Sequence, residues 1–529
     1  MDRHLGAPCP RVHFAPANSP QPGAPHLPWR GAGANVVAMS ERAPTLAELV
    51  SATLELPPGK EAIEYLGQHY NWGEVQRVAA QTRAALASAG IGDGAVSFVP
   101  RNRPSALAAL TGMLADGRTV RMVYAFQSPA AIAAAIVKLD SPAVVLAGED
   151  FTAEVQAALK ARHIAAVLLT EMTARLHPDF ASARPRRAPE QPSVDILTSG
   201  TTGAPKQFPI LHEVFARYVL NQGMTFIEDP SEPPFLFTFP IGNISGMYST
   251  CAGFFRGKRV LLADRFSVPV YVDYVKRFRP ASGGAPPAAV SMILDAKVPK
   301  ADLASIKYFS TGAAPLDPTV QRRFEETYGI PVILSYGATE FGGPVVAMTP
   351  ALHAEWGEKK FGSVGRPMPG VSLRLRDADS GEVLPLGNEG VLEVVSPRMG
   401  PEWIRTSDIV FIDADGFVFC RGRNDGAIMR GGFKVLPETI ERALLLHPAV
   451  SAAGVVGVPD VRLHEVPAAA ILLKPGADDP GAEGLKAHLR ETLMATHIPV
   501  HWMFLGELPK NASFKIDRPG LKRMFVEAG

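Results

Sequence analysis

This chain of 529 residues has little cysteine, no long apolar run and almost no net charge. Its three cysteines, Cys9, Cys251 and Cys420, lie far apart, and no two have metal-ligand spacing. That pattern argues against a disulfide scaffold and fits a reducing cytoplasm, where we expect the protein to reside. No stretch approaches the roughly eighteen apolar residues of a membrane span, so no integral membrane segment is expected. A formal net charge of +1 gives no electrostatic footprint for nucleic acid.

The first 38 residues lack both a periodic pattern and the apolar core of a signal peptide. They hold seven prolines and four glycines, and we interpret residues 1–38 as a disordered N-terminal extension. A helix-like pattern begins just after Met39. The sequence therefore leaves both Met1 and Met39 open as the start of translation.

The length favours two or more domains, and an apolar content of 47% is enough to build sizeable cores. Residues 74–90 place Val75, Val78, Thr82 and Leu86 on one helical face and end at Gly90, a suitable C-cap. Short apolar runs typical of buried parallel strands occur at 143–148, 165–170, 259–264 and 331–337. This alternation predicts an α/β body of helix-covered sheets.

After about residue 360 the pattern changes to antiparallel β structure, with a strand at 391–396 and a hairpin over 408–420 that turns at 413–416. Beyond 425 come a helix-like stretch, two apolar strands and a further helix at 483–495, which predict a small α+β domain. We expect a large domain over 39–421 that includes a β-subdomain, a hinge at 422–425, and a small mobile C-terminal domain over 426–529.

The segment TSGTTGAPK, residues 198–206, gathers hydroxyls, glycines and a lysine in one short loop. Such a loop forms a poor core and a poor helix, but its backbone N–H groups can surround an oxygen-rich anion. Its glycine spacing differs from that of the Walker A motif. The sequence therefore predicts a phosphate loop of another kind.

Further motifs follow this loop in a fixed order. YGATE (336–340) ends an apolar strand, where α/β sheets bind ligands, and offers the Tyr336 ring for a nucleobase and the Glu340 carboxylate for Mg²⁺. RTSDIV supplies the Asp408 carboxylate, and LPKNASFKIDR supplies Lys515 near the C-terminus. GRNDGAIMRGGFKV contributes four further candidates: Arg423, Asp425, Gly431 and Gly432.

In this order the motifs closely resemble those of the adenylate-forming superfamily, of the acyl- and aryl-CoA synthetase type, over about residues 45 to 525. STGAAPL (310–316) resembles the family's adenine-side segment, and FGSVGRPMPG (361–370) its later linker. The resemblance implies a reaction in two steps. ATP first activates a carboxylic acid as its AMP anhydride, and a thiol then displaces AMP.

The resemblance also implies roles for individual residues. Lys515 would bridge the carboxylate and the α-phosphate, Glu340 would help to hold Mg²⁺ together with Thr201, and Lys206 would act beside them. Asp425 would be the hinge. The nucleotide site would comprise Thr198, Ser199, Gly200, Thr201, Thr202, Gly203, Lys206, Gly312, Ala313, Ala314, Tyr336, Gly337, Ala338, Thr339, Asp408, Arg423 and Lys515. The CoA side would comprise Gly431, Gly432 and Lys434, and the acyl pocket would include Asn243, Gly312 and Gly337.

Three positions depart from the family pattern. Phe514 stands before the lysine where glycine is usual, and a bulky ring there restricts the loop. Ser407 replaces the usual glycine before Asp408, which is a mild change. Asn243 stands where many relatives carry histidine at the edge of the acyl pocket, which suggests an unusual acid.

The sequence alone therefore predicts an ATP-dependent carboxylate–CoA ligase that uses ATP, Mg²⁺ and CoA. Two alternatives stay open: a stand-alone adenylation protein that loads a carrier protein, and a non-catalytic nucleotide-binding relative disabled by Phe514. The sequence ends fourteen residues after Lys515, so we expect no fused carrier domain. The sequence does not distinguish an aromatic acid from a medium- or long-chain acid as the substrate. It does not predict the oligomeric state either.

Other conspicuous residues have structural interpretations. His447 and His464 lack spaced metal partners, so we expect surface or cap positions. The apolar stripe at 440–446 is expected in the core, and Cys251 and Cys420 are expected to be buried small hydrophobes.

Overall fold

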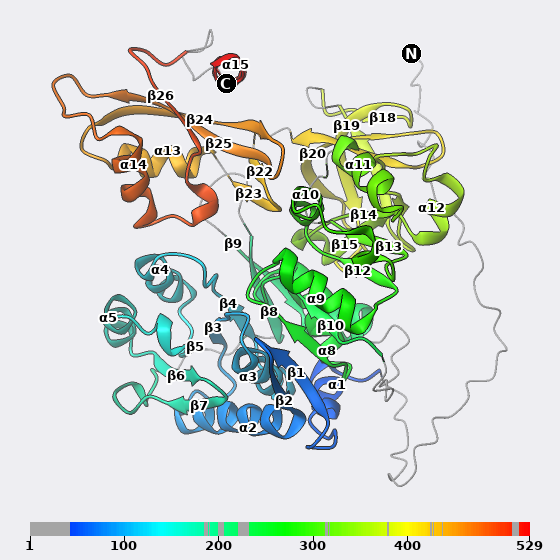
Figure 1. Cartoon of the computed structure of the whole chain (residues 1–529). Coiled ribbons are helices and arrows are strands. Elements are labelled where there is room, and N and C mark those ends of the chain that lie inside the picture. The colour runs from blue at the N-terminus through cyan, green and yellow to red at the C-terminus, as the bar shows by residue number, and fades with distance from the viewer. Residues whose placement is uncertain are drawn as a thin grey trace, which may run out of the picture.

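The computed structural model describes residues 43–184, 189, 191–198, 206–220, 232–312, 316, 318–377, 380–423, 426, 428–435, 437–509 and 518–528. The extension at 1–38 and the hinge residues 424 and 425 lie outside these ranges. Figure 1 shows a large body with the small domain, in orange and red, at one side of it. The large body plus small C-terminal domain is the predicted architecture.

A seven-stranded sheet forms the first part of the body. The strands lie in the order β7 (Thr173–Leu176), β6 (Ala165–Thr170), β5 (Ala143–Ala147), β3 (Val96–Val99), β4 (Val120–Met122), β8 (Ser193–Thr198) and β9 (Lys206–Leu211). The five inner strands run parallel and the two edge strands antiparallel. The predicted runs at 143–148 and 165–170 are two of the inner strands.

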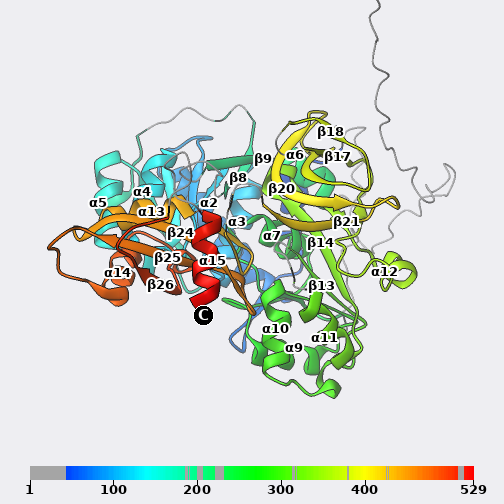
Figure 2. The ribbon, with the colours of Figure 1, turned by 90° about the horizontal axis from the view of Figure 1, so that it is seen from above.

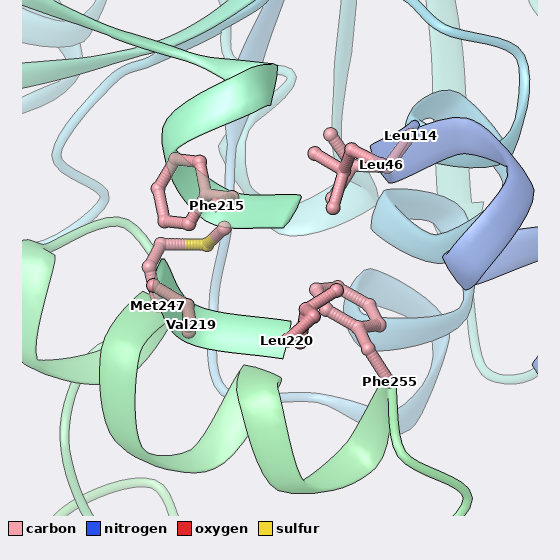
Figure 3. Close-up of a pocket in the computed structure, with 7 residues that line it drawn as sticks. All are labelled: Leu46, Leu114, Phe215, Val219, Leu220, Met247 and Phe255. Atoms are coloured by element: carbon pink, nitrogen blue, oxygen red, sulfur yellow. The ribbon is translucent and has the colours of Figure 1, made fainter. Parts of the chain in front are cut away.

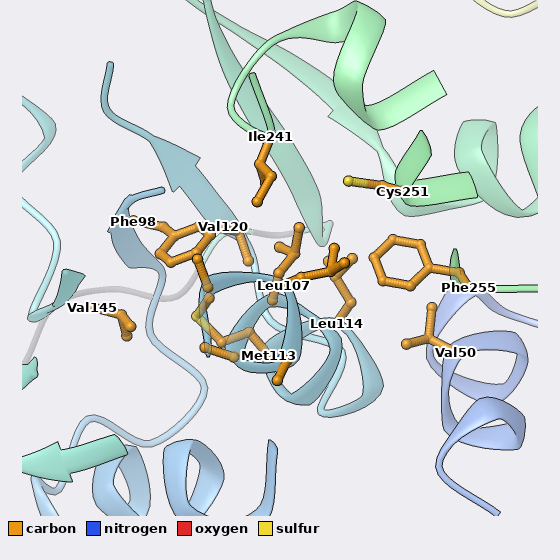
Figure 4. Close-up of a cluster of buried hydrophobic side chains, with 14 of the residues drawn as sticks. Val50, Phe98, Leu107, Met113, Leu114, Val120, Val145, Ile241, Cys251 and Phe255 are labelled. Atoms are coloured by element: carbon orange, nitrogen blue, oxygen red, sulfur yellow. The ribbon is translucent and has the colours of Figure 1, made fainter. Parts of the chain in front are cut away.

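Helices cover both faces of this sheet because its inner strands are apolar on both sides. Val145 on β5 belongs to the core beneath α2 (Trp72–Ser88) and α3 (Pro104–Ala115), whereas its neighbours Val144 and Leu146 face α4 (Pro129–Leu139) and α5 (Ala153–Arg162). Figure 4 shows the first of these cores, where Phe98, Leu107 and Met113 meet.

The helix predicted at 74–90 is α2. Its buried residues include all four that the periodicity selects, Val75, Val78, Thr82 and Leu86. Asn71 caps its N-terminus through a hydrogen bond from the Glu74 N–H (3.0 Å). Gly90 follows with φ of +69°, the left-handed conformation expected after a helix end.

Two further sheets complete the α/β part. One has the order β10 (Phe235–Phe237), β11 (Val260–Leu262), β1 (Glu61–Tyr65), β2 (Gln68–Asn71), and the other β12 (Ser282–Gly284), β13 (Tyr308–Thr311), β14 (Val332–Ala338), β15 (Gly343–Ala347), β16 (Arg366–Pro367). β12, β13 and β14 run parallel, and β15 and β16 are antiparallel. The accompanying helices are α9 (Val268–Phe278), α10 (Pro287–Asp295), α11 (Pro318–Tyr328) and α12 (Pro350–Trp356).

The β-subdomain is an antiparallel sheet of β18 (Val383–Leu384), β17 (Ser372–Arg376), β19 (Glu389–Val395), β20 (Ile404–Ile412) and β21 (Val418–Arg423). The predicted hairpin is β20 and β21. The Gly416 N–H closes its turn on the Asp413 carbonyl (3.0 Å). Figure 2 shows this sheet, in yellow, beside the green helices and strands of the body.

The small domain has a sheet of β23 (Phe433–Val435), β22 (Ile428–Arg430), β25 (His464–Leu473) and β24 (Val450–Asp460), with β26 (His501–Phe504) paired to β25. Its helices are α13 (Pro437–Leu445), α14 (Gly481–Arg490) and α15 (Arg518–Ala528). The helix predicted over 483–495 thus ends five residues early. A 3₁₀ turn at Ala495–His497 follows it instead.

The stripe at 440–446 is only partly core. Ile440 and Leu444 are buried, but Leu445 is 47% and Leu446 76% exposed, because α13 ends at Leu445 and the chain turns outward. Cys251 is buried and Cys420 is half-buried. His464 is exposed, and His447 accepts a hydrogen bond from the Ala449 N–H (3.2 Å), so the surface and cap interpretation holds.

Candidate active site

The phosphate loop begins and ends on two paired strands of the seven-stranded sheet. β8 and β9 are antiparallel, and Thr198 faces Lys206 across the pair. The loop residues Ser199, Gly200, Thr201, Thr202 and Gly203 lie outside the described residues, as do the side chains of Thr198 and Lys206. The two ends of the motif, Thr198 and Lys206, therefore lie side by side next to the carboxyl end of the inner strand β4.

The motif YGATE lies where the sequence predicts it, at the carboxyl end of β14. Gly312 follows the neighbouring parallel strand β13, so the two motifs meet at one edge of the sheet. Both positions require glycine because other backbone atoms approach them closely. At Gly312 an added Cβ would lie 2.9 Å from the Ser335 carbonyl oxygen, and at Gly337 it would lie 2.5 Å from the Gly343 carbonyl oxygen. Ala313 and Ala314 lie outside the described residues.

Tyr336 and Asp408 are in direct contact. The Tyr336 hydroxyl donates to Asp408 Oδ2 (2.6 Å), joining β14 to the β-subdomain. Asp408 pairs in register with Arg423 on β21, although the Arg423 side chain is not described. Two residues predicted to hold base and ribose therefore share one site, and a third lies beside them on the backbone.

Glu340 belongs to a 3₁₀ turn, Thr339–Phe341, that follows β14 directly. Its carboxylate is half-buried and has no hydrogen-bond or ion-pair partner within the described part of the chain. A carboxylate oxygen of this kind suits Mg²⁺. Ala338 and Thr339 precede it on the same edge, so the predicted metal ligand and base contacts are neighbours.

Asn243 caps a short helix, α7 (Ile244–Gly246), by accepting from the Gly246 N–H (2.7 Å). Gly246 is fixed in turn, because an added Cβ would overlap the Pro240 carbonyl. The Asn243 side chain at this position therefore has a local structural role as a helix cap.

Gly431 and Gly432 form the turn between β22 and β23, with φ of +54° and +89°. The family resemblance places these glycines on the CoA side, where a narrow passage for the thiol arm would leave no room for a Cβ, but a left-handed turn already requires them. The next residue, Phe433, meets Tyr124 of the large body edge-to-face at 6.0 Å between ring centres. Lys434 follows on β23, with its side chain not described. Lys515 and Asp425 lie outside the described residues.

An apolar pocket lies elsewhere in the body (Figure 3). Its walls come from α1 (Leu46–Thr53), α3 and the π-helical turns Phe215–Leu220 and Met247–Cys251, and the short helices α6 (His212–Val214) and α8 (Ala252–Phe254) flank these turns. The lining residues are Leu46, Leu114, Phe215, Val219, Leu220, Met247 and Phe255. The sequence favours residues 239–248, 282–292, 310–314 and 336–346 as walls of the acyl pocket. Only Met247 of the lining residues falls within them, so this cavity was not predicted.

Sequence reasoning also missed two polar groups near the motif edge. The Arg398 Nε and the Tyr248 hydroxyl are buried without a hydrogen-bond partner. Tyr248 lies in the segment 239–248, which is expected to wall the acyl pocket, but its hydroxyl was not singled out. Arg398 belongs to no expected segment, so no sequence signal marked it.

The described residues include no helix that is long and apolar enough to cross a membrane.

Together, the fold and this edge of the sheet define a nucleotide-binding enzyme with a separate small domain. The chain matches the AMP-binding enzyme family over residues 50–402 and the AMP-binding enzyme C-terminal domain over residues 439–515. The protein belongs to this family.

Individual relatives agree with that assignment. The chain is 29% identical to a sulfoacetate–CoA ligase of Cupriavidus necator, over 90% of this chain and 96% of the relative. It is 29% identical to a fatty acid–[acyl-carrier-protein] ligase of Streptomyces coeruleorubidus, over 64% of this chain and 68% of that protein. Its fold is similar to that of an amide bond synthetase from Marinactinospora thermotolerans, with a TM-score of 0.78 and 26% identity, covering 91% of this chain and 99% of that one.

Proposed function

We propose that this protein is an ATP-dependent carboxylate–CoA ligase that forms an acyl-adenylate, releases pyrophosphate, and then releases AMP as the thioester forms. The observation that carries the proposal is the hydrogen bond from Tyr336 to Asp408 at the sheet edge where the predicted site residues Gly312 and Gly337 also lie. A flat ring beside a carboxylate that accepts from hydroxyls suits a nucleoside.

The first half-reaction joins a carboxylate oxygen to the α-phosphorus of ATP and breaks the bond to pyrophosphate. Negative charge builds on phosphorus and on the leaving group, so positioning and charge stabilisation are the main tasks. Lys515 would hold the carboxylate against the α-phosphate, and Lys206 and the backbone N–H groups at 199–203 would hold the outer phosphates. Glu340 and Thr201 would hold Mg²⁺, which neutralises phosphate charge when bound.

In the second half-reaction a thiolate sulfur attacks the acyl carbon and AMP departs with the electron pair of the broken C–O bond. Asp408 and Arg423 would keep hold of the ribose. The small domain would turn about Asp425 to remove Lys515 and bring Gly431, Gly432 and Lys434 to the thiol path. The contact between Phe433 and Tyr124 supports such an approach of this segment to the body.

The test uses the two half-reactions separately. Pyrophosphate release with Mg·ATP over a broad panel of acids should detect adenylation. Lys515→Ala should reduce adenylation about 100-fold or more, while thioester formation from preformed acyl-AMP stays within about threefold. Equal loss in both steps would refute the separate roles of the two domain arrangements. Folded protein that releases no pyrophosphate with any acid would favour the non-catalytic alternative.

The acceptor deserves its own assay, because the relatives include a carrier-protein ligase and an amide bond synthetase. Preformed acyl-AMP is offered CoA, a holo carrier protein or an amine, and the product is identified by mass. CoA thioester as the main product supports the proposal. Acyl carrier protein as the main product would support the second candidate instead.

A further inference from the structure

Arg398 is held firmly against the strand that pairs with the YGATE motif. The segment that follows β19 is anchored by Ser396, whose hydroxyl donates to the Phe341 carbonyl (2.7 Å). Arg398 Nη1 donates to the Pro344 carbonyl on β15 (2.5 Å). Pro344 faces Gly337 across the β14–β15 ladder. The guanidinium therefore lies one strand away from a residue of the predicted acyl pocket.

This guanidinium has no acidic partner. No carboxylate forms an ion pair with Arg398 within the described part of the chain, and its Nε is buried without a hydrogen bond. Because Nη1 is already used, the edge formed by Nε and Nη2 is the one left for a ligand. That edge presents two parallel N–H groups, the geometry that binds a carboxylate with both of its oxygens.

Tyr248 adds a second unpaired donor next to Arg398. Its hydroxyl is buried without a partner, and the Arg398 Cζ lies 6.0 Å from its ring centre. The ring packs flat on β15, since an added Cβ at Gly343 would lie 2.7 Å from Tyr248 Cε1. Tyr248 follows the short helix that Asn243 caps, so the pair lies between two predicted walls of the acyl pocket.

Arg398 is half-buried, and leaving its enclosed Nε without an acceptor costs free energy, which argues that the site is completed by a ligand. Burial lowers the pKa of Arg398 and raises that of Tyr248, as expected for polar groups short of partners. The reacting carboxylate does not meet this need, because it loses its charge on becoming the mixed anhydride with AMP. The partner must stay anionic through both half-reactions.

We propose that Arg398 and Tyr248 bind a second anionic group, a carboxylate or a sulfonate, on the acid that the enzyme activates. The inference rests on the proposed function and narrows its substrate to acids with two acidic groups. Tyr218 supports the site from the other side: its ring centre also lies 6.0 Å from Arg398 Cζ, and its hydroxyl donates to the Pro397 carbonyl (3.0 Å).

The experiment compares matched acids. Dicarboxylic acids of three to eight carbons and short sulfo-carboxylic acids are each paired with the monomethyl ester or the unsubstituted acid of equal length. Pyrophosphate release gives kcat/KM for each. The wild-type protein should prefer the dianionic member of at least one pair by about 10- to 100-fold, the range of a hydrogen bond to a charged group. Arg398→Met should abolish that preference and change kcat/KM for the monoanionic acids less than threefold.

Two further variants separate a ligand contact from a structural one. Arg398→Lys keeps the charge but loses the two-pronged edge, so it should restore only part of the preference. Arg256→Met is the matched control, because Arg256 also has a buried, unpartnered Nε and donates to a backbone carbonyl, that of Val219, away from β15. Arg256→Met should lower kcat/KM for all acids equally or leave it unchanged.

Several results would overturn the inference. A wild-type preference for monoanionic acids would do so without any variant. The inference would also fail if Arg398→Met lowered kcat/KM equally for both members of a pair, or if it changed KM for CoA rather than KM for the acid. If no acid supports pyrophosphate release, the proposed function fails. The inference is then judged by thermal shift with the same dicarboxylic acids, which should stabilise the wild-type protein, stabilise Arg398→Lys less, and not stabilise Arg398→Met.

Discussion

At the residue scale, the contact between Tyr336 and Asp408 ties two motifs together. The sequence predicted each residue from its own motif, but 72 positions separate them and nothing local predicts their hydrogen bond. Their meeting depends on how the β-subdomain packs on β14. The Phe341 core joins the two sheets there, because Phe341, Val345 and Leu392 pack in one cluster.

Removing the Tyr336 hydroxyl tests that contact. Tyr336→Phe keeps the ring and leaves Asp408 without this donor, so the site should hold the ribose less firmly. We expect KM for ATP to rise about 10- to 100-fold, the range for one hydrogen bond to a charged group, with little change in KM for the acid. Steady-state pyrophosphate release measures both. Tyr70→Phe, whose hydroxyl bonds to Gln68 on the surface (2.7 Å), is the control and should change neither constant.

Two buried histidines predict how the stability of the fold depends on pH. Burial lowers the pKa of His212 to about 4, and the same cause lowers that of His497 to about 4. In the unfolded chain a histidine binds its proton near pH 6.5. Between pH 6.5 and 4 the unfolded state therefore binds more protons, and stability falls as the pH falls.

For each histidine the loss between pH 7 and pH 5 should be about 2 kcal/mol. Denaturant midpoints of wild-type protein and His212→Gln at the two pH values give the measurement. The variant should lose less stability than the wild type on acidification. A parallel decline in both proteins would contradict the burial argument for His212.

At the element scale, the sequence predicted strand and helix positions well where periodicity was strong. The runs at 143–148, 165–170 and 331–337 became β5, β6 and β14, and the helix at 74–90 became α2. The sequence-based prediction was wrong at helix ends. The helix α14 stops at Arg490, and Leu445 and Leu446, at the end of α13 and just after it, are exposed. Apolar residues alone do not reveal which turn of a helix extends beyond its core, because that is set by the neighbouring strands.

The pairing of β14 with β15 supports a prediction about Gly337. Gly337→Ala would place Cβ 2.5 Å from both the Gly343 carbonyl oxygen and Pro344 Cα, so the strands must separate. We expect a loss of about 2–3 kcal/mol in stability and a loss of adenylation greater than the loss of folded protein. Thermal melting and pyrophosphate release provide the two readouts.

Gly59→Ala is the control for that change, since nothing lies within 4 Å of the added Cβ and its φ is not positive. It should leave melting temperature and activity as they are. An unchanged melting temperature in Gly337→Ala would show that β15 yields easily. The close approach would then not explain the glycine.

At the scale of the whole molecule, the sequence predicted a large body of helix-covered sheets, a β-subdomain and a small domain, but not the order of the strands within each sheet. Strand order depends on contacts between segments far apart, such as β1 pairing with β11 across about two hundred residues. The same limit hid Arg398, whose importance follows only from what lies around it. Motifs mark residues that act on common chemistry. Arg398 lies outside every motif, so its proposed part in selecting the acid has no sequence signal.

The two domains touch through Phe433, and that contact has a kinetic consequence. The ring meets Tyr124 directly after the Gly431–Gly432 turn, so this arrangement brings the predicted CoA-side segment to the body. An edge-to-face pair is worth about 1 kcal/mol, enough to shift the balance between two domain arrangements about fivefold. Phe433→Ala should therefore slow thioester formation from preformed acyl-AMP about fivefold and leave adenylation unchanged or slightly faster.

Single-turnover assays of each half-reaction make this comparison, because steady-state rates mix the two steps. Phe504→Ala is the control: it removes an exposed ring on β26 of the same small domain, and should alter neither step. Slower adenylation with normal thioester formation in Phe433→Ala would assign this contact to the other half of the cycle. Its geometry would then belong to the arrangement that brings Lys515 to the nucleotide, and the roles given to Gly431 and Gly432 would have to be reversed with it.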